Sequence, residues 1–398
     1  MNPSLENLQL YPFQKLAKLF ENLAPADASS AAIALHIGEP KHALPEFIRQ
    51  VLIDNLGELA RYPSVRGTGR LRESIAHWLM RRYQLAAVNP DTEVIPVNGS
   101  REALFAFAQV IIDNRSVKPA VICQNPFYQI YEGAALLAGA EPCFLNQLPD
   151  SDFAVETAQL PDAVWQRTQL VYICSPNNPT GKVLTLDEWQ HLFALSDRYG
   201  FVIAADECYS EIYFDEEQPP LGALEAAEKL GRSGFPRLVV FSSLSKRSNV
   251  PGMRSGFVAG DAAIIKQFLL YRTYHGCAMN PAVQIASAAA WEDEQHVVSN
   301  RDLYREKFAS AIRVLEDTLS VSRPDAGFYL WLKTPVCGVE FARRLYQEEN
   351  VTVLPGSYLA RKAHGVNPGE DFVRIALVAP VAECVEAMTR IRALAQKI

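Results

Sequence analysis

The stretch LVVFSSLSK, residues 238–246, joins a run of four apolar residues to a lysine that stands among small hydroxyl residues. The apolar run predicts a buried strand, which places Lys246 just beyond its end. Burial there disfavours the ammonium form of a lysine, and a neutral amine can form a Schiff base with an aldehyde. Arg254 follows eight residues later, in a glycine-flanked turn. Serine hydroxyls and a guanidinium are the donors that a phosphate needs, so one hypothesis is a lysine that binds a phosphate-bearing aldehyde. The alternative is an exposed loop lysine, one of 12 in the chain, and the motif taken alone favours it.

Short apolar runs and helical patterns alternate on both sides of this stretch. The predicted strands are residues 93–97, 120–123, 141–145, 170–174, 201–205, 238–242 and 256–260, and the predicted helices are residues 69–83, 101–112, 128–138, 186–199 and 262–273. Near-continuous apolar strands separated by helices indicate a mostly parallel sheet that is covered by helices on both faces. We therefore expect an α/β fold whose large domain spans residues 45–290.

The pattern changes after residue 290. We predict helices at residues 302–319, 338–349 and 381–396, and strands at residues 327–332, 351–354 and 372–376. This mixture indicates a smaller α+β domain at residues 291–398. The N-terminal arm, residues 1–44, is expected to join it.

Composition excludes several classes of protein. A net charge of −7 over 398 residues gives no reason to expect nucleic acid or an anionic membrane as a partner. Seven cysteines without a C-x-x-C pair, and histidines without ligand spacing, argue against a disulfide framework or a metal site. The first residues lack the pattern of an export signal, and the most apolar window, residues 276–291, is too broken to span a bilayer. We expect a cytoplasmic protein.

Polar residues follow several of the predicted strands, and ligands of open parallel sheets bind at those strand ends. Gly99, Ser100 and Arg101 follow the first strand and open a helix, whose N–H groups attract anions; a capped turn is the alternative. Tyr128 follows strand 120–123 and can stack on a planar ring, although such a tyrosine is often core. Asn178 lies in a loop that two prolines hold in a defined shape, where its amide could donate to an aromatic oxygen.

Two charged residues sit where apolar surroundings make charge costly. Asp206 directly follows the predicted strand at residues 201–205 and needs a cation, either the protonated nitrogen of a heterocycle or an arginine. Arg374 lies inside the apolar strand at residues 372–377. A guanidinium there either binds a carboxylate through two hydrogen bonds or lies on an edge strand with its side chain in water.

Together these residues match one molecule, pyridoxal 5'-phosphate, which binds a lysine as a Schiff base and an aspartate at its pyridine nitrogen. The chain resembles the fold-type I, class I/II aminotransferases over nearly its whole length. The motifs that carry this resemblance, in order, are Gly38-Glu39-Pro40, Tyr62-x4-Gly67, Asn98-Gly99-Ser100, Tyr128, Asn178-Pro179-Thr180-Gly181, Asp206-Glu207-x-Tyr209, Ser243-x-Ser245-Lys246, Arg254 and Arg374. An aspartate-aminotransferase-like fold is implied.

The resemblance also implies a role for each residue. Lys246 would bind the cofactor and shuttle a proton, Asp206 would keep the pyridine nitrogen protonated, and Tyr128 would stack on the ring. Asn178 and Tyr209 would bond the ring hydroxyl oxygen. The phosphate would be held by Ser243, Ser245, Arg254 and the amides of Ser100 and Arg101. Arg374 and the backbone of Gly38 would bind the substrate α-carboxylate. Tyr62 would reach the phosphate in the other subunit, which implies a homodimer with shared sites.

Several strings, among them NGSREALFAFAQ and SSLSKRSNVPGMRSGFVAGD, resemble bacterial succinyldiaminopimelate transaminases of lysine biosynthesis. Those enzymes exchange an amino group between glutamate and the 6-oxo form of N-succinyl-2-aminopimelate. Such multiply anionic substrates call for extra cations. Candidates for that role are Arg272, His275, Arg101 and Lys41.

Other functions stay open on the same motifs. An aspartate or aromatic aminotransferase, or a β-lyase acting on cystathionine-like substrates, would use the same lysine. A transcription regulator with an aminotransferase-like domain would need a DNA-binding module ahead of residue 40, where only a short arm stands. A dinucleotide-binding dehydrogenase is disfavoured because Arg72 occupies the place of the third glycine after Gly67-Thr68-Gly69.

Overall fold

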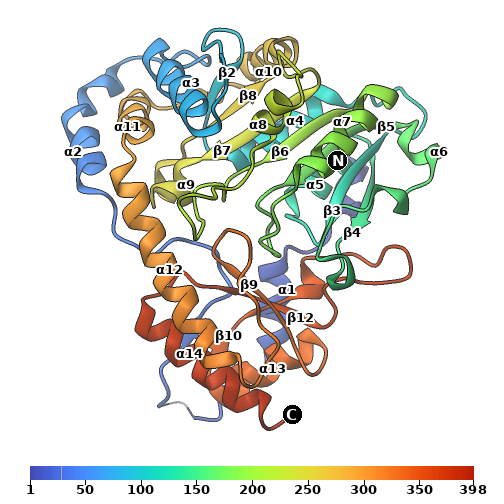
Figure 1. The fold of residues 1–398 in the computed structure, drawn as a ribbon, viewed down its shortest axis with the longest axis vertical. Helices are drawn as coiled ribbons and strands as arrows, with labels where there is room; N and C mark the ends of the chain where they lie inside the picture. Colours follow the sequence, from blue (N-terminus) through green and yellow to red (C-terminus); the bar gives the residue numbers. More distant parts are fainter. Residues whose placement is uncertain (28) are drawn as a thin grey trace.

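The computed structural model describes residues 1–27 and 29–398, and a seven-stranded sheet lies at its centre (Figure 1). The strand order is β2-β8-β7-β6-β5-β3-β4. The strands are β2 (Val94–Val97), β3 (Ala120–Asn125), β4 (Glu141–Asn146), β5 (Thr168–Cys174), β6 (Val202–Asp206), β7 (Leu238–Ser243) and β8 (Gly256–Gly260). β8 runs antiparallel to both of its neighbours, β2 and β7, and the other described pairs are parallel, so the predicted mostly parallel sheet is confirmed.

The alternation of side chains along buried strands explains why helices cover both faces. In β7, Val239 and Phe241 pack on one face, whereas Leu238 and Val240 pack on the other. The first face is covered by α4 (Ser100–Ile111), α5 (Ile130–Leu137) and α10 (Ala262–His275). The second face is covered by α3 (Gly69–Tyr83), α7 (Leu186–Tyr199), α8 (Ala223–Lys229) and α11 (Pro281–Glu292), and a short helix, α6 (Asp162–Trp165), also packs there.

A second, smaller sheet occupies the lower part of Figure 1. It has the order β11-β12-β9, with β9 (Tyr329–Lys333), β11 (Leu354–Pro355) and β12 (Phe372–Ala376), and packs with α13 (Gly338–Glu349) and α14 (Val381–Ala395). The N-terminal arm contributes β1 (Ile33–Ala34), which pairs with β10 (Val351–Thr352). The arm therefore contributes a strand beside this part of the fold. The division at residues 44 and 290 stays a prediction.

Several predicted elements differ from the structure. The helix expected at residues 302–319 is α12 (Gln295–Leu315), which runs from the large sheet to the small one. The single strand expected at residues 351–354 is divided between β10 and β11, which belong to different sheets. Helices α1 (Pro12–Phe20), α2 (Glu46–Asp54) and α11 were not predicted.

The start of α11 explains one of these misses. Asn280 and Pro281 interrupt the apolar window, but Asn280 accepts hydrogen bonds from the amides of Ala282 and Val283, and Pro281 opens the helix. They are thus a start signal rather than a break. Among the described residues, no helix has both the length and the apolar composition needed to cross a membrane.

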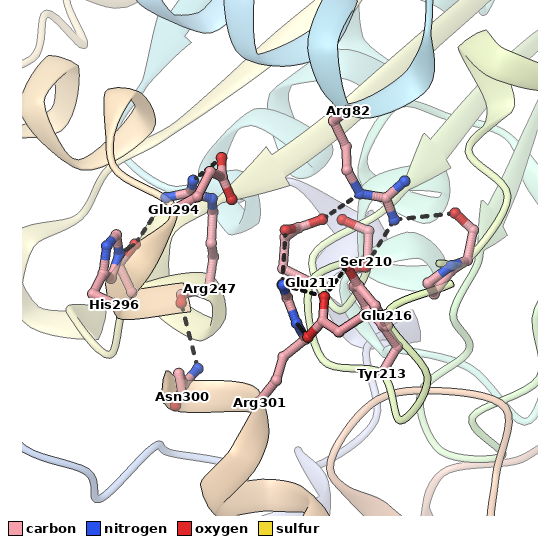
Figure 2. A network of polar contacts seen from close by, with 12 residues as sticks. Arg82, Ser210, Glu211, Tyr213, Glu216, Arg247, Glu294, His296, Asn300 and Arg301 are labelled. Carbon is pink, nitrogen blue, oxygen red and sulfur yellow. Dashed lines mark hydrogen bonds and ion pairs between the residues drawn. The ribbon is translucent and has the colours of Figure 1, made fainter. Parts of the chain in front are cut away.

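A buried ion network joins the two parts of the fold (Figure 2). Glu211, which follows β6 and is 3% exposed, accepts hydrogen bonds from Nε of Arg82 on α3 at 2.6 Å and from Nη1 of Arg301 on α12 at 3.4 Å. Arg301 also donates twice to Glu216, at 2.8 Å each. Because both arginines are buried, the Glu211 carboxylate balances charge that water does not reach.

Replacing Glu211 tests this network. We expect Glu211→Gln to lower the free energy of unfolding by about 3 kcal/mol, because two buried guanidinium groups lose a shared charge. The measurement is urea unfolding at fixed protein and cofactor concentration. Glu46→Gln is the control, since Glu46 forms an exposed pair with Arg49 and should leave the midpoint unchanged. Equal midpoints for both variants would contradict the network's role.

Candidate active site

One cavity of about 480 Å³ lies where the carboxyl ends of β2, β5, β6 and β7 meet the amino end of β8. Of the 13 residues predicted for the site, 12 line it. They are Gly38, Ser100, Arg101, Tyr128, Asn178, Asp206, Tyr209, Ser243, Ser245, Lys246, Arg254 and Arg374. The small sheet and the N-terminal arm supply Arg374 and Gly38, so both parts of the fold build the cavity.

Lys246 projects into this cavity from α9 (Leu244–Arg247), the short helix that follows β7. Its Nζ donates to the carbonyl oxygen of Gly38 and lies 5.1 Å from the ring centroid of Phe328. Burial lowers the pKa of Lys246 to about 8. The ion pairs of the described residues include none at this lysine, so a neutral amine is within easy reach of physiological pH.

Asp206 ends β6 and is 4% exposed. It accepts hydrogen bonds from the hydroxyl of Tyr131 at 2.7 Å and from the backbone amide of Cys208 at 3.3 Å. Both donors are neutral, and burial raises the pKa of Asp206. The alternative of an arginine partner is not met among the residues described here, so the carboxylate is available for a cation brought by a ligand.

An anion cradle lies at the start of α4. Gly99 has φ +81°, and a Cβ there would lie 2.3 Å from Nη2 of Arg254, so only glycine lets this guanidinium approach. Across the cradle, the hydroxyl of Ser243 lies 2.9 Å from that of Ser245 and accepts from its amide at 3.1 Å. Backbone amides, hydroxyls and a guanidinium together form a site suited to a phosphate.

Arg374 lies on β12, the central strand of the small sheet, which rules out the edge-strand alternative. It is 3% exposed and donates to Oδ1 of Asn178 and to the carbonyl of His36, both at 2.9 Å. Its Nε finds no partner in the described part of the chain. A buried guanidinium without an acidic partner fits the carboxylate of a ligand.

Arg101 stands at the rim with its side chain exposed. It donates to the hydroxyl of Tyr128 and, at 3.3 Å, to that of Tyr11 from the N-terminal arm. Tyr209 lies deeper, with its hydroxyl 3.2 Å from that of Tyr329. The rim therefore carries a positive charge that tyrosine hydroxyls orient without neutralising it.

Comparison with known proteins identifies the family of this chain. The sequence model of Aminotransferase class I and II matches residues 30–391. The chain belongs to this family. Its members are pyridoxal-phosphate-dependent enzymes that act on amino acid and oxo acid substrates, so the predicted activity class and cofactor are confirmed.

Individual relatives support the same assignment. The LL-diaminopimelate aminotransferase of Nitratidesulfovibrio vulgaris (Hildenborough) is 30% identical over 94% of this chain and 96% of that protein. A solved aminotransferase structure from Neisseria meningitidis Z2491 shares 53% identity at a TM-score of 0.96, over 99% of this chain and 100% of that one. A probable N-succinyldiaminopimelate aminotransferase from Thermus thermophilus shares 25% identity at a TM-score of 0.83, over 96% and 99%. The predicted aspartate-aminotransferase-like fold is confirmed.

The residues of this aminotransferase fit its cofactor. Pyridoxal phosphate offers an aldehyde, a phosphate and a basic pyridine nitrogen. The cavity offers an amine with a lowered pKa at Lys246, the cradle at Gly99 and Arg254, and the buried, cation-free carboxylate of Asp206. Each group of the cofactor thus meets a complementary side chain that has no ion-pair partner among the described residues.

Four of the named residues lie outside this cavity: Tyr62, which is expected to reach the phosphate of the other subunit, and three of the four candidate cations for the substrate. Tyr62 is fully exposed, outside the cavity. Arg272 is wrong as a cation for the substrate, because it is buried and donates to both carboxylate oxygens of Glu102 at 3.0 Å. His275 and Lys41 do not line the cavity, and Lys41 lies 3.9 Å from Glu383. Of the proposed extra cations, only Arg101 reaches the cavity.

The aminotransferase cavity also contains residues that sequence reasoning missed. They are Tyr11, Glu39, Cys208 and Tyr329, together with Tyr131, which bonds Asp206 behind the cavity wall. Tyr131 had a signal, since it follows Tyr128 by three residues at the start of α5. Tyr11 and Tyr329 had none, because their neighbours in sequence do not differ from an ordinary arm and an ordinary strand.

The lowered pKa of Lys246 has a measurable consequence. At a pKa of about 8, roughly one lysine in ten is neutral at pH 7, against roughly one in three thousand at the ordinary value. The rate at which the cofactor-free enzyme captures pyridoxal phosphate should therefore rise roughly tenfold per pH unit below about pH 8 and level off above it. Stopped-flow absorbance measures this rate, with butylamine as the reference. A rate that still climbs between about pH 9 and about pH 10 would show an unshifted lysine.

Proposed function

We propose that this aminotransferase exchanges an amino group between glutamate and N-succinyl-2-amino-6-oxopimelate, to give 2-oxoglutarate and N-succinyl-LL-2,6-diaminopimelate in lysine biosynthesis. The observation that carries the proposal is the charge of the cavity. Its lining has four basic side chains, Arg101, Lys246, Arg254 and Arg374, and two acidic ones, Glu39 and Asp206. This surplus suits a substrate with several carboxylates.

Each basic residue of the cavity is suited to a different anionic group of the cofactor or substrate. Arg254 lies in the phosphate cradle, and Arg374 is shaped for the α-carboxylate together with the backbone at Gly38. That leaves Arg101, whose hydrogen-bond partners are two tyrosine hydroxyls, to bind a distal carboxylate. The name of the similar Thermus thermophilus protein, a probable N-succinyldiaminopimelate aminotransferase, supports this choice of substrate.

Pyridoxal phosphate, when bound, supplies an aldehyde for amines and a protonated ring that withdraws electrons from the substrate Cα. Lys246 holds it through Nζ and, as a neutral amine, accepts and returns the Cα proton. Asp206 keeps a proton on the pyridine nitrogen, because a carboxylate in an apolar wall is stabilised by a cation. Asn178 and Tyr209 would donate to the ring oxygen, Tyr128 would stack on the ring, and the phosphate would be held by the backbone amides of Ser100 and Arg101 together with the side chains of Ser243, Ser245 and Arg254.

We also propose that the enzyme is a cytoplasmic homodimer. Apolar side chains on and beside α2, those of Ile53, Leu56 and Leu59, are exposed next to the fully exposed Tyr62. A second copy covering this surface would bury it and bring Tyr62 toward the phosphate of the other subunit. The described cysteines are all free, which suits a reducing compartment.

A second donor has support of its own. The similar protein from Nitratidesulfovibrio vulgaris is named LL-diaminopimelate aminotransferase. That donor carries a free amino group where the succinylated one carries an amide, and the exposed carboxylate of Glu39 lines the cavity within reach of such a cation. LL-2,6-diaminopimelate is therefore the alternative substrate.

A substrate panel separates these possibilities. With 2-oxoglutarate as acceptor, we expect N-succinyl-LL-2,6-diaminopimelate to give a higher kcat/KM than LL-2,6-diaminopimelate, aspartate or phenylalanine. Arg101→Met should lower kcat/KM for the succinylated donor by about tenfold or more and leave phenylalanine unaffected, because a charged hydrogen bond is lost only where a distal carboxylate exists. Lys41→Met is the matched control and should change neither value.

Other results of the panel would overturn the proposal. A higher kcat/KM for LL-2,6-diaminopimelate would favour the second donor, and one for aspartate or phenylalanine would favour the corresponding aminotransferase. Pyruvate and ammonia released from cystathionine without a keto acid would show a β-lyase.

A further inference from the structure

The helix that carries Lys246 is held from behind by one asparagine. Helix α9 has four residues, too few to be stable alone, and its last carbonyls have no partners within the helix. Nδ2 of Asn300 on α12 donates to the carbonyl oxygen of Lys246 at 3.1 Å and to that of Arg247 at 3.3 Å. Figure 2 shows Asn300 beside Arg247. Asn300, which does not line the cavity, thus caps the end of α9.

The other end of the Asn300 amide is fixed by a chain of donors. Its Oδ1 lies 2.7 Å from Nδ1 of His42, and Nε2 of His42 lies 2.5 Å from Nζ of Lys307, which is 2% exposed. A lysine ammonium can only donate, so Nε2 of His42 accepts and Nδ1 carries the proton that it donates to Asn300. Burial lowers the pKa of His42, which agrees with a neutral ring.

This order of donors decides how Asn300 points. Because Oδ1 must face His42, the two amide protons face the carbonyls of α9. Asn249 adds a second donor to the same oxygen at 2.9 Å. The amide orientation is thus set by residues that lie outside the cavity.

This series of hydrogen bonds ends near Arg374, the arginine expected to bind the substrate carboxylate. Nζ of Lys307 also donates to the carbonyl oxygen of Val378 at 3.1 Å, four residues beyond Arg374 on the segment that follows β12. His42 lies on the same short segment as Gly38, whose carbonyl accepts from Nζ of Lys246. The hydrogen bonds of Asn300, His42 and Lys307 therefore connect the backbone of Lys246 with the segments that carry Arg374 and Gly38.

A separate anchor holds the neighbouring residue. Arg247, which is buried, donates to the carbonyl of Ala290 at 2.6 Å and to the carboxylate of Glu294 at 2.8 Å. These contacts hold α9 against the end of α11 (Figure 2). Because Asn300 takes no part in these Arg247 contacts, we expect Asn300 variants to keep the fold while the position of Lys246 changes.

We propose that Asn300, oriented by His42 and Lys307, is a positioning residue that fixes Lys246 relative to Arg374. It touches neither substrate nor cofactor and acts through the carbonyls of α9. The inference concerns the aminotransferase reaction with any amino donor and does not depend on the substrate proposed above.

The first test changes the amide to a carboxylate. Asn300→Asp keeps the shape but cannot donate to the carbonyls, so we expect kcat to fall about tenfold or more with KM nearly unchanged. The isotope effect on kcat/KM with a Cα-deuterated donor should rise, because proton transfer by Lys246 becomes slower. The visible absorbance of the holoenzyme, recorded without turnover, should show a shifted pH midpoint. Asp302→Asn, on the exposed side of α12, is the matched control and should change none of these values.

The second test uses His42 and guards against loss of the fold. His42→Gln can still accept from Lys307 and donate to Asn300, so it should keep kcat and the absorbance midpoint near those of the native enzyme. His42→Leu can do neither and should behave as Asn300→Asp does. Equal values for the two His42 variants, or an Asn300→Asp enzyme with native isotope effect and absorbance, would overturn the proposal.

Discussion

Asp206 is buried and Lys246 is half-buried, and neither has an opposite charge bonded to it in the described structure. Such burial is unfavourable, and it moves each group toward its neutral form. Their separation from solvent follows from the sheet, since β6 and β7 are adjacent and parallel and bring both side chains to the same edge. A cofactor that brings a cation to the carboxylate and an aldehyde to the amine relieves both penalties. The other contacts of the cavity depend on this pair.

The large sheet could be predicted because its strands are buried on both faces and therefore read as apolar runs. The strand at residues 256–260 has the predicted bounds, and every other strand of this sheet lies within two residues of its prediction. The site residues that follow these strands were found for the same reason. Where a polar residue acted as a cap, as Asn280 does, the pattern was misread. Local signals cannot distinguish a helix interruption from a helix start when both use asparagine and proline.

Contacts between residues distant in the chain could not be predicted in this way. Arg272 was a candidate for binding a substrate carboxylate because it is basic, but the fold places it against Glu102, 170 residues away in the sequence. His42 and Asn300 are separated by 258 residues, and neither has a motif. Their partners are set by α12, which crosses from the large sheet to the small one and carries both Asn300 and the buried Arg301 (Figure 1). The sequence motif around Lys246 is therefore enough to identify this lysine. Its position in the cavity depends on contacts between segments that are distant in the sequence.

Borohydride reduction of the holoenzyme, followed by digestion and mass spectrometry, tests most directly whether this cavity holds the cofactor at Lys246. Reduction makes the bond between the cofactor and its amine permanent, so the modified peptide identifies the lysine. The cavity predicts that the peptide containing residues 244–247 carries the added mass at Lys246, among the 12 lysines of the chain. Modification of a different lysine, with Lys246 unmodified, would contradict the account.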